Sequence, residues 1–288
     1  MPNSADRSPV EAIFHREGDS FVPTPAAHSP WYPDSQHGSP MLGLLARAVE
    51  LHPSEHPMQV TRLTVDLTRA APMSAVTTVA KLRRATRSID WIEASLLVDG
   101  EEFASAVGMR FRLKSIEILE ASDDFSEPPP ILPESSDGLG WMARDLDGDG
   151  IHSVVEIRPV PRFETPTAWF RLKVPLVADE ETTPFQRAAF ASDMVYSVPF
   201  LRWMHVDKKM LFKRPFLAIN PDTTINLHRP PCSEWICLDS RVNYDARGAG
   251  TAVARVYDEQ GAIGSMSQSL FLRDLGSVPR DWSKYVDA

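Results

Sequence analysis

The sequence predicts an α+β protein made of two related units, each with one enclosed helix and a run of antiparallel strands. The first observation is a repeat: residues 63–72 resemble residues 223–231, and residues 104–111 resemble residues 264–271 at the same offset. Because the offset of 160 is even, both copies keep the same alternation of side chains along a strand. The second observation is that one helix-like segment precedes each repeat, as expected when two copies bury their apolar faces together.

The first unit is predicted to begin with a helix over residues 41–51, directly after Pro40. Only Arg47 and Glu50 are polar in this segment, and a helix that is apolar nearly all round must be enclosed by the protein. Alternating apolar residues then predict strands, and the turn Asp99-Gly100 connects the last two. These strands are expected near residues 63–67, 76–82, 91–98 and 103–113.

An irregular entry over residues 1–40 precedes the helix of the first unit. The second unit repeats the order of one enclosed helix followed by a run of strands. Its helix is predicted over residues 185–198, because Thr183 is a favourable N-cap, Pro184 a favourable first residue and Pro199 a stop. Strands are expected near residues 154–158, 168–174, 223–229, 234–242, 251–258 and 263–273.

Residues 115–150 are predicted to link an N-terminal unit, residues 1–114, to a C-terminal unit, residues 151–288. The window 117–149 holds ten acidic residues and one basic residue, Arg144, and this composition disfavours a packed core. Of the 39 acidic and 30 basic residues that give the net charge of −9, the rest of the chain keeps 29 of each. A nucleic-acid-binding protein would be expected to carry a basic excess, so no nucleic-acid partner is predicted.

The sequence gives no sign of a membrane segment or an address for export. Its longest apolar stretch, Met41 to Ala46, is too short to cross a bilayer, and no charged start precedes an apolar run. We therefore expect a cytoplasmic protein with no membrane partner. The two cysteines, Cys232 and Cys237, should point to opposite faces of an extended segment, so neither a disulfide nor a zinc site is expected.

Three polar residues stand where the surrounding pattern is apolar. Asp193 shares an apolar helix face, where a carboxylate is costly unless it is paired or used. Gln268 interrupts the apolar stripe of the last predicted strand, and its first-copy counterpart is Gly108. Asn220, with the counterpart Val60, precedes the strand that opens the second repeat. A structural role stays open for each residue: a surface acid, a core amide satisfied by its neighbours, and a turn.

An acidic segment matches the calcium loop of the EF-hand, with Asp145, Asp147 and Asp149 at its start and Glu156 at the twelfth position. That loop requires flanking helices, whereas glycines precede this segment and a strand pattern follows it. A solvated acidic turn is the favoured interpretation, and calcium binding is the alternative.

His37 and Gly38 lie directly before the first predicted helix, where they could help the helix-terminal amides to bind an anion or a carbonyl. No glycine-rich phosphate loop, Gly-x-Ser-x-Gly elbow or Cys–His pairing is present. Hydrolysis by a serine nucleophile is therefore not predicted.

These motifs, taken in order and spacing, resemble the acyl-CoA thioesterase II family, which is built from two fused hot-dog units in one chain. The resemblance covers roughly residues 12–114 and 152–274. The resemblance implies a double hot-dog fold, in which each unit wraps an antiparallel sheet around a long helix. The residues that carry it are Ser29-Pro30-Trp31, Gln36-His37-Gly38, Ala191-Ser192-Asp193, His228-Arg229-Pro230, Glu234-Trp235, Gly261, Ser265, Gln268 and Arg273.

By this resemblance, the catalytic set is an aspartate in the second helix, a hydroxyl residue before the His-Arg-Pro strand and a glutamine in the last strand. Asp193 and Gln268 match the first and third, and Asn220 falls where the family has Thr or Ser. Thr223 and Thr224 lie close enough in sequence to substitute. The implied reaction is hydrolysis of an acyl-CoA by a water that these residues orient, with no metal, cofactor or covalent intermediate.

Two alternatives and an assembly state accompany this hypothesis. A catalytically impaired acyl-CoA-binding or scaffold protein would explain the departure at Asn220. A hot-dog enoyl-CoA hydratase would need an Asp–His spacing that is not found near residues 183–198. Exposed strand edges and sheet faces favour symmetric association, so a homodimer or homotetramer is expected.

Overall fold

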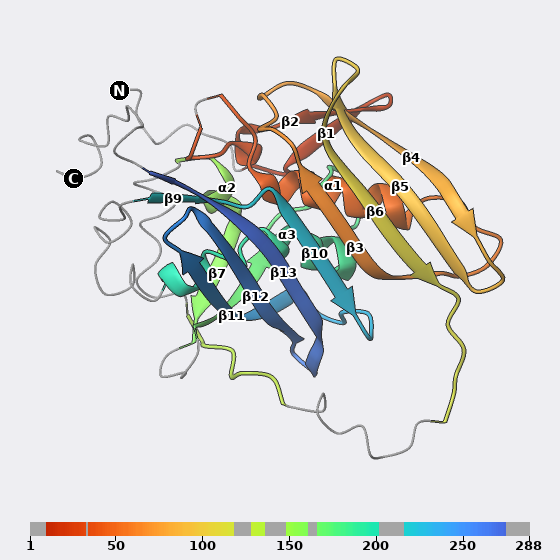
Figure 1. The fold of residues 1–288 in the computed structure, drawn as a ribbon. Coiled ribbons are helices and arrows are strands. Elements are labelled where there is room, and N and C mark those ends of the chain that lie inside the picture. The colour runs from red at the N-terminus through yellow and green to blue at the C-terminus, as the bar shows by residue number, and fades with distance from the viewer. Residues whose placement is uncertain are drawn as a thin grey trace.

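A computed structural model of the chain describes residues 10–32, 34–117, 128–135, 148–160, 166–201 and 216–274. Within these residues, one large antiparallel sheet curves around two helices that lie against one of its faces (Figure 1). The α+β class predicted from the sequence is confirmed.

The elements follow the chain in the predicted order, with several short additions. The first half contains β1 (Phe14–Glu17), β2 (Ser20–Pro23), the 3-10 helix η1 (Pro25–Ala27), α1 (Gly38–Glu50), β3 (Gln59–Leu67), β4 (Val76–Ala85), β5 (Ile89–Val98) and β6 (Glu101–Phe111). The second half contains α2 (Ile151–Val154), β7 (Val155–Pro159), β8 (Thr167–Leu172), α3 (Pro184–Ser192), β9 (Phe216–Ile219), β10 (Asp222–Leu227), β11 (Trp235–Asp245), β12 (Ala249–Asp258) and β13 (Gly261–Asp274).

The two repeated segments lie next to each other at the centre of the sheet. The strand order is β1-β2-β4-β5-β6-β3-β10-β13-β12-β11-β8-β7, and β9 pairs with β13 off this path. Thr64 of β3 stands opposite Thr224 of β10, its own counterpart 160 residues later, and the two hydroxyl oxygens are 3.3 Å apart. The register of β3 on β6 recurs at the same offset in β10 on β13. A local two-fold axis between the two threonines therefore relates the halves of the sheet.

α1 is enclosed on nearly every side, as its sequence predicts. Ten of its 13 residues are buried, and it packs beside α3 and against the strands of its own half. Its two charged residues connect it to the second half. Arg47 Nε donates to Glu180 Oε2 at 2.6 Å, and Glu50 Oε2 accepts from Thr183 Oγ1 at 2.7 Å and from Gln186 Nε2 at 2.9 Å.

The sequence analysis missed the shortest elements and misplaced two helix boundaries. β1, β2, β9 and α2 have four residues each, too few for a hydrophobic period to show. α1 begins at Gly38 rather than at residue 41, because His37, whose backbone is extended, is its N-cap residue. α3 ends at Ser192 rather than at residue 198, for a reason that lies in the candidate site.

Part of the predicted linker packs against the outer face of the sheet. Leu132 lies on a small apolar cluster separate from the main core, and Arg158 Nη1 donates to the carbonyl of Pro133 at 2.7 Å. The residues of this cluster are Trp169, Trp235, Cys237, Tyr257 and Ala262. Residues 118–127 and 136–147 lie outside the described residues, and the division into two units and a linker stays an interpretation.

The calcium alternative does not fit the surroundings of Glu156, which lies in β7. Arg158 Nη2 and Arg171 Nη2 each approach its carboxylate to 2.6 Å, so the twelfth position of the motif is occupied by ion pairs. Asp145 and Asp147 lie outside the described residues. In the part of the chain that the structure describes, no group of three His, Cys, Asp or Glu residues could hold a metal ion.

Two other expectations can be compared with the described residues. Cys232 and Cys237 are both free, the first exposed and the second buried. No helix among the described residues is long and apolar enough to cross a membrane.

Candidate active site

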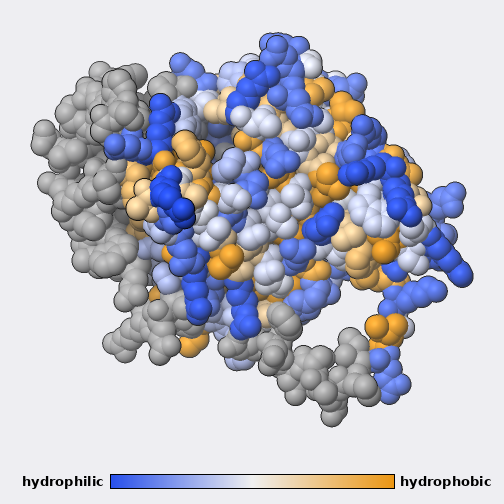
Figure 2. Space-filling model, viewed as in Figure 1, coloured by the Kyte–Doolittle hydropathy of each residue, from blue (hydrophilic) through white to orange (hydrophobic). Residues whose placement is uncertain are grey.

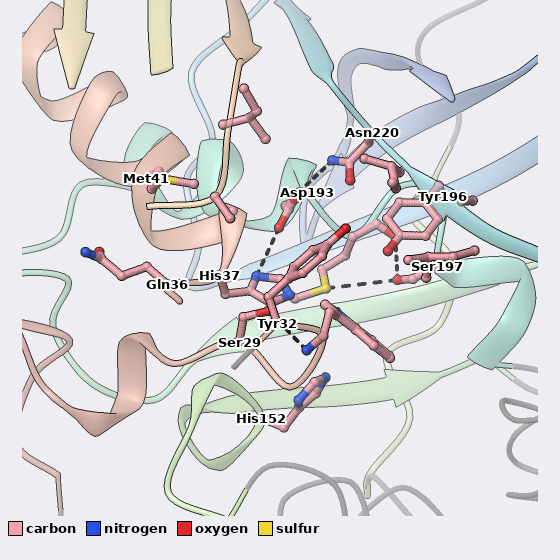
Figure 3. Close-up of a pocket in the computed structure, with 18 of the residues that line it drawn as sticks. Ser29, Tyr32, Gln36, His37, Met41, His152, Asp193, Tyr196, Ser197 and Asn220 are labelled. Carbon is pink, nitrogen blue, oxygen red and sulfur yellow. Dashed lines mark hydrogen bonds and ion pairs between the residues drawn. The ribbon is translucent and has the colours of Figure 1, made fainter. Parts of the chain in front are cut away.

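A cavity of about 370 Å³ lies between the beginning of α1, the end of α3 and the segment that joins β9 to β10 (Figure 3). Both halves of the chain line it, and apolar and aromatic side chains make up most of its wall. The apolar part of the wall includes Trp31, Met41, Ile157, Met194, Phe200, Leu201 and Leu217. The polar part includes Ser29, Gln36, His37, His152, Asp193, Tyr196, Ser197 and Asn220.

Asp193 is a buried carboxylate at the edge of this cavity, only 5% exposed. Its Oδ1 accepts a hydrogen bond from Asn220 Nδ2 at 2.7 Å. Its Oδ2 accepts one from Ser39 Oγ at 3.1 Å and lies 3.0 Å from His37 Nδ1 (Figure 3). Donors from α1 and from the loop before β10 therefore surround a charge carried at the end of α3.

The two polar groups closest to His37 Nδ1 require opposite protonation states of this nitrogen. The backbone N–H of Ser39, 3.2 Å away, would need a lone pair on Nδ1, whereas the Asp193 carboxylate would need a hydrogen there. A hydrogen bond to a charged acceptor is about twice as strong as one between neutral groups. A lone pair facing a buried carboxylate would also be repelled. We therefore assign the Nδ1 hydrogen to the bond with Asp193.

The surroundings of Asp193 keep its side chain ionised. Burial alone raises the pKa of this carboxyl, but the charge and hydrogen bond of His37 and the hydrogen bonds of Asn220 and Ser39 outweigh it, so the pKa lies below its ordinary value. A carboxylate with a lowered pKa stabilises the folded state at pH values above its unfolded pKa. This contribution is lost as the pH falls through the folded pKa.

Gly38 lets the carboxylate approach the first turn of α1. A Cβ at this position would lie 2.7 Å from Asp193 Oδ2 and 2.8 Å from Oδ1, closer than atoms can pack. The carboxylate thus rests against the positive end of the α1 dipole, which favours a negative charge.

Gln268 connects β13 to the end of α3 through both polar atoms of its amide. Its Oε1 accepts from the backbone N–H of Tyr196 at 3.1 Å, and its Nε2 donates to the carbonyl of Ser192 at 2.9 Å. In a continuous α-helix, that N–H would donate directly to that carbonyl. The Gln268 amide therefore takes the place of one helical hydrogen bond and holds Ser192 and Tyr196 apart.

This insertion explains why the helix predicted over residues 185–198 ends early. Residues 193–197 form a turn, in which the N–H of Met194 donates to the carbonyl of Ala191 at 2.9 Å, and a helical segment resumes at residue 198. Asp193 is consequently the C-cap of α3 and not a residue on a mid-helix face. The sequence argument found the buried carboxylate but placed it in the wrong backbone context.

The structure brings four of the seven predicted site residues to the cavity wall and places three behind it. Asp193, Asn220, His37 and Gly38 line the cavity. Gln268 is buried behind the end of α3, where its Nε2 also donates to Thr223 Oγ1 at 3.1 Å. Thr224 faces Thr64 at the centre of the sheet. The predicted contacts of Gln268, Thr223 and Thr224 with a water or a substrate therefore have no support in this geometry.

The first half of the chain holds a carboxylate in a similar position, which the sequence comparison missed. Glu50 at the end of α1 contacts the N-cap of α3, as Asp193 contacts the N-cap of α1. Burial raises the pKa of Glu50 and outweighs the hydrogen bonds from Thr183 and Gln186, opposite to the result for Asp193.

The sequence analysis did not identify two polar residues of the site: Ser39, which is buried and contacts Asp193, and His152, which lines the cavity. Ser39 follows His37 and Gly38 at the start of α1, so its position two residues after the N-cap was a usable signal. The His152 ring lies 6.3 Å from the His37 ring, edge to face. No pattern in the sequence relates these two histidines, since α2 is a single turn.

Family models match both halves of the chain. The model of the acyl-CoA thioesterase C-terminal domain matches residues 125–272, and that of the acyl-CoA thioesterase N-terminal domain matches residues 27–111. No curated protein sequence matches this chain.

Solved structures with the same fold cover nearly the whole chain at low sequence identity. Acyl-CoA thioesterase II TesB2 from Mycobacterium marinum is 16% identical, with a TM-score of 0.60, over 92% of this chain and 95% of that one. A protein with hot-dog fold from Alicyclobacillus acidocaldarius is 17% identical, with a TM-score of 0.60, over 90% and 94%. A tesB protein from Mycobacterium avium subspecies paratuberculosis is 13% identical, with a TM-score of 0.58, over 90% and 95%.

Replacing Gln268 with Ala should destabilise the protein, because it removes the amide that bonds the partly buried N–H of Tyr196 and the buried carbonyl of Ser192. An unsatisfied buried group costs about 1–3 kcal/mol, and urea unfolding measures the loss. Thr223→Val is the matched control, since it removes only the third bond of the same amide. Equal losses of unfolding free energy in the two variants would contradict the insertion of the Gln268 amide between Ser192 and Tyr196.

Gly38→Ala should also lower the free energy of unfolding, by about 1–3 kcal/mol, because the new methyl group overlaps the Asp193 carboxylate. Gly43→Ala adds the same group to the same helix, but there it meets only side-chain carbons of Leu176, at 3.0 Å and beyond. We expect a smaller loss for this control in the same unfolding measurement. A Gly38→Ala protein as stable as the wild type would show that the carboxylate does not need this close approach.

Proposed function

This chain belongs to the acyl-CoA thioesterase family, and we propose that it hydrolyses the thioester bond of an acyl-CoA to give a free acid and coenzyme A at the cavity beside Asp193. The observation that carries this proposal is a buried, ionised carboxylate within hydrogen-bond reach of a histidine at the wall of an apolar cavity. Water bound in such a site can be activated next to a carbonyl that the apolar wall holds in place.

Within this proposal, Asp193 supplies the negative charge that activates the water. Asn220 holds the carboxylate from the side opposite to His37, and its amide nitrogen serves as the donor that a Thr or Ser hydroxyl would supply. Gln268 acts indirectly, because its hydrogen bonds to Tyr196 and Ser192 stabilise the turn that directs Asp193 toward the cavity. Asn220 therefore does not by itself argue for a loss of activity.

The acyl group would occupy the apolar part of the cavity. Trp31, Phe200 and Leu217 are among the side chains that could contact its hydrocarbon chain. Arg69, which follows β3, lines the cavity and has a side chain that is about half exposed. A volume of about 370 Å³ suits an acyl group rather than the whole coenzyme, most of which would remain outside.

We also propose that the two halves are two fused hot-dog units that share one continuous sheet. Two observations support this division. β10 and β13 correspond to β3 and β6 at a constant offset of 160 residues, and β3 pairs with β10 at the local two-fold axis. Each half contributes one of the two long helices, α1 or α3.

A hot-dog hydratase is the second candidate, because Asp193 and His37 do meet in space although they are far apart in sequence. A hydratase would add water to the double bond of an enoyl-CoA, which lowers the enoyl absorbance without releasing a thiol. A non-enzymatic acyl-CoA-binding protein would bind the thioester and do neither. The two signals, followed together on one enoyl-CoA, distinguish the three functions.

Asp193→Asn should lower the rate of thiol release from a series of acyl-CoAs on the order of 10²-fold or more, since it removes the charge that activates the water. The matched control is Asp66→Asn, which changes an exposed carboxylate of β3. Full activity of Asp193→Asn on every accepted substrate would refute the assignment.

The chain is further proposed to form a homodimer or homotetramer. Val79, Leu82, Val253 and Phe271 are each about half exposed, and Figure 2 shows hydrophobic side chains interspersed with polar ones on the face of the sheet toward the viewer. Light scattering at micromolar concentration should give a mass of two or four chains. A strict monomer would contradict this expectation.

A further inference from the structure

The two ring nitrogens of His37 have different surroundings. Nδ1 faces Asp193 at 3.0 Å, and the side chains of both residues are less than one-tenth exposed. The ring also forms part of the cavity wall, and its Nε2 has no hydrogen-bond partner among the described residues (Figure 3). With the hydrogen on Nδ1, the lone pair of Nε2 is available to a molecule in the cavity.

We propose that His37 is the catalytic base, taking a proton from the attacking water at Nε2, and that Asp193 is the positioning residue that acts through it. This inference rests on the proposed thioester hydrolysis and names the group that touches the water.

The state of Asp193 supports this division of roles. Both of its oxygens already accept hydrogen bonds, one from Asn220 and the other from Ser39 and His37. Donors from three side chains stabilise the charged form of this carboxylate, which makes it a poorer proton acceptor than a carboxylate without such partners. A proton taken up at Nε2 places a positive charge on the ring, whose Nδ1 lies 3.0 Å from the Asp193 carboxylate, so the two opposite charges attract each other.

The proposed reaction balances without any other group. The water oxygen attacks the thioester carbon, one water proton moves to His37 Nε2, and the carbonyl π electrons move to the carbonyl oxygen. When the carbonyl re-forms, the carbon–sulfur bond breaks and its electron pair goes to sulfur. The proton on Nε2 then passes to sulfur, so the products are the carboxylic acid and the thiol of coenzyme A, and His37 returns to its starting state.

Other titratable groups around the ring could produce a pH effect of their own. His152 from α2 lies 6.3 Å from the His37 ring, and Asp193 is the nearest charge. Tyr32, Tyr196 and Arg69 line the same cavity, and Arg69 is paired with Glu101. A test of His37 therefore has to separate it from His152.

The test compares His37→Asn with His37→Gln in the full-length protein, using thiol release from an acyl-CoA that the wild type hydrolyses. Asn is a good N-cap and offers an amide close to the Nδ1 position, so it can keep both α1 and Asp193 in place. Gln extends an amide toward the Nε2 position instead. Neither amide can accept and return a proton, so kcat should fall about 10²–10⁴-fold in both variants with KM little changed.

The pH profile of kcat/KM provides the second measurement. The wild type should lose activity on the acidic side as the base becomes protonated, and this limb should be absent from the residual activity of His37→Asn. The limb should persist in His152→Gln.

Two results would overturn the inference: near wild-type kcat in a folded His37→Asn protein, or an acidic limb that disappears with His152 and not with His37. Circular dichroism and urea unfolding establish that each variant is folded. A wild type that releases no thiol from any acyl-CoA would instead refute the proposed function itself, so the two failures are distinguishable.

Discussion

The burial of one negative charge is the constraint around which this site is organised. Asp193 lies at the end of α3 with almost no access to water, and an isolated carboxylate there would be costly. Its charge is tolerated because Ser39 and His37 from α1 and Asn220 from the loop after β9 all approach it. These contacts join the first half of the chain to the second, so the relative position of α1 and α3 and the shape of the cavity depend on them.

Differences between positions that the local two-fold axis relates explain why the described residues form one such site and not two. In the second half, the Gln268 amide interrupts the helix and Asp193 turns toward the cavity. In the first half, the counterpart of Gln268 is Gly108, and a Cβ there would lie only 2.3 Å from Val49 Cγ1. Val49 fills that space, and the neighbouring Glu50, whose pKa burial raises, instead contacts Thr183, the N-cap of α3. The same backbone plan therefore gives a structural half and a half suited to chemistry.

Most of the fold could be predicted from the sequence, because long strands and an enclosed helix leave clear periodic patterns. Asp193 and Asn220 were also found this way, as polar residues in apolar surroundings. The contact between His37 and Asp193 could not be found, since no pattern relates α1 to the end of α3. The early end of α3 was missed for a similar reason: Gln268, which interrupts the helix, lies 76 residues away from Ser192.

The most direct test of this account is a crystal structure with a thioether analogue of an acyl-CoA, which cannot be hydrolysed. We expect the acyl chain to lie against the apolar wall near Phe200 and Leu217. The carbon that replaces the carbonyl should be close enough to His37 Nε2 for one water to lie between them, with Asp193 on the far side of the ring. An analogue bound with this carbon outside the cavity, or away from both His37 and Asp193, would contradict the account.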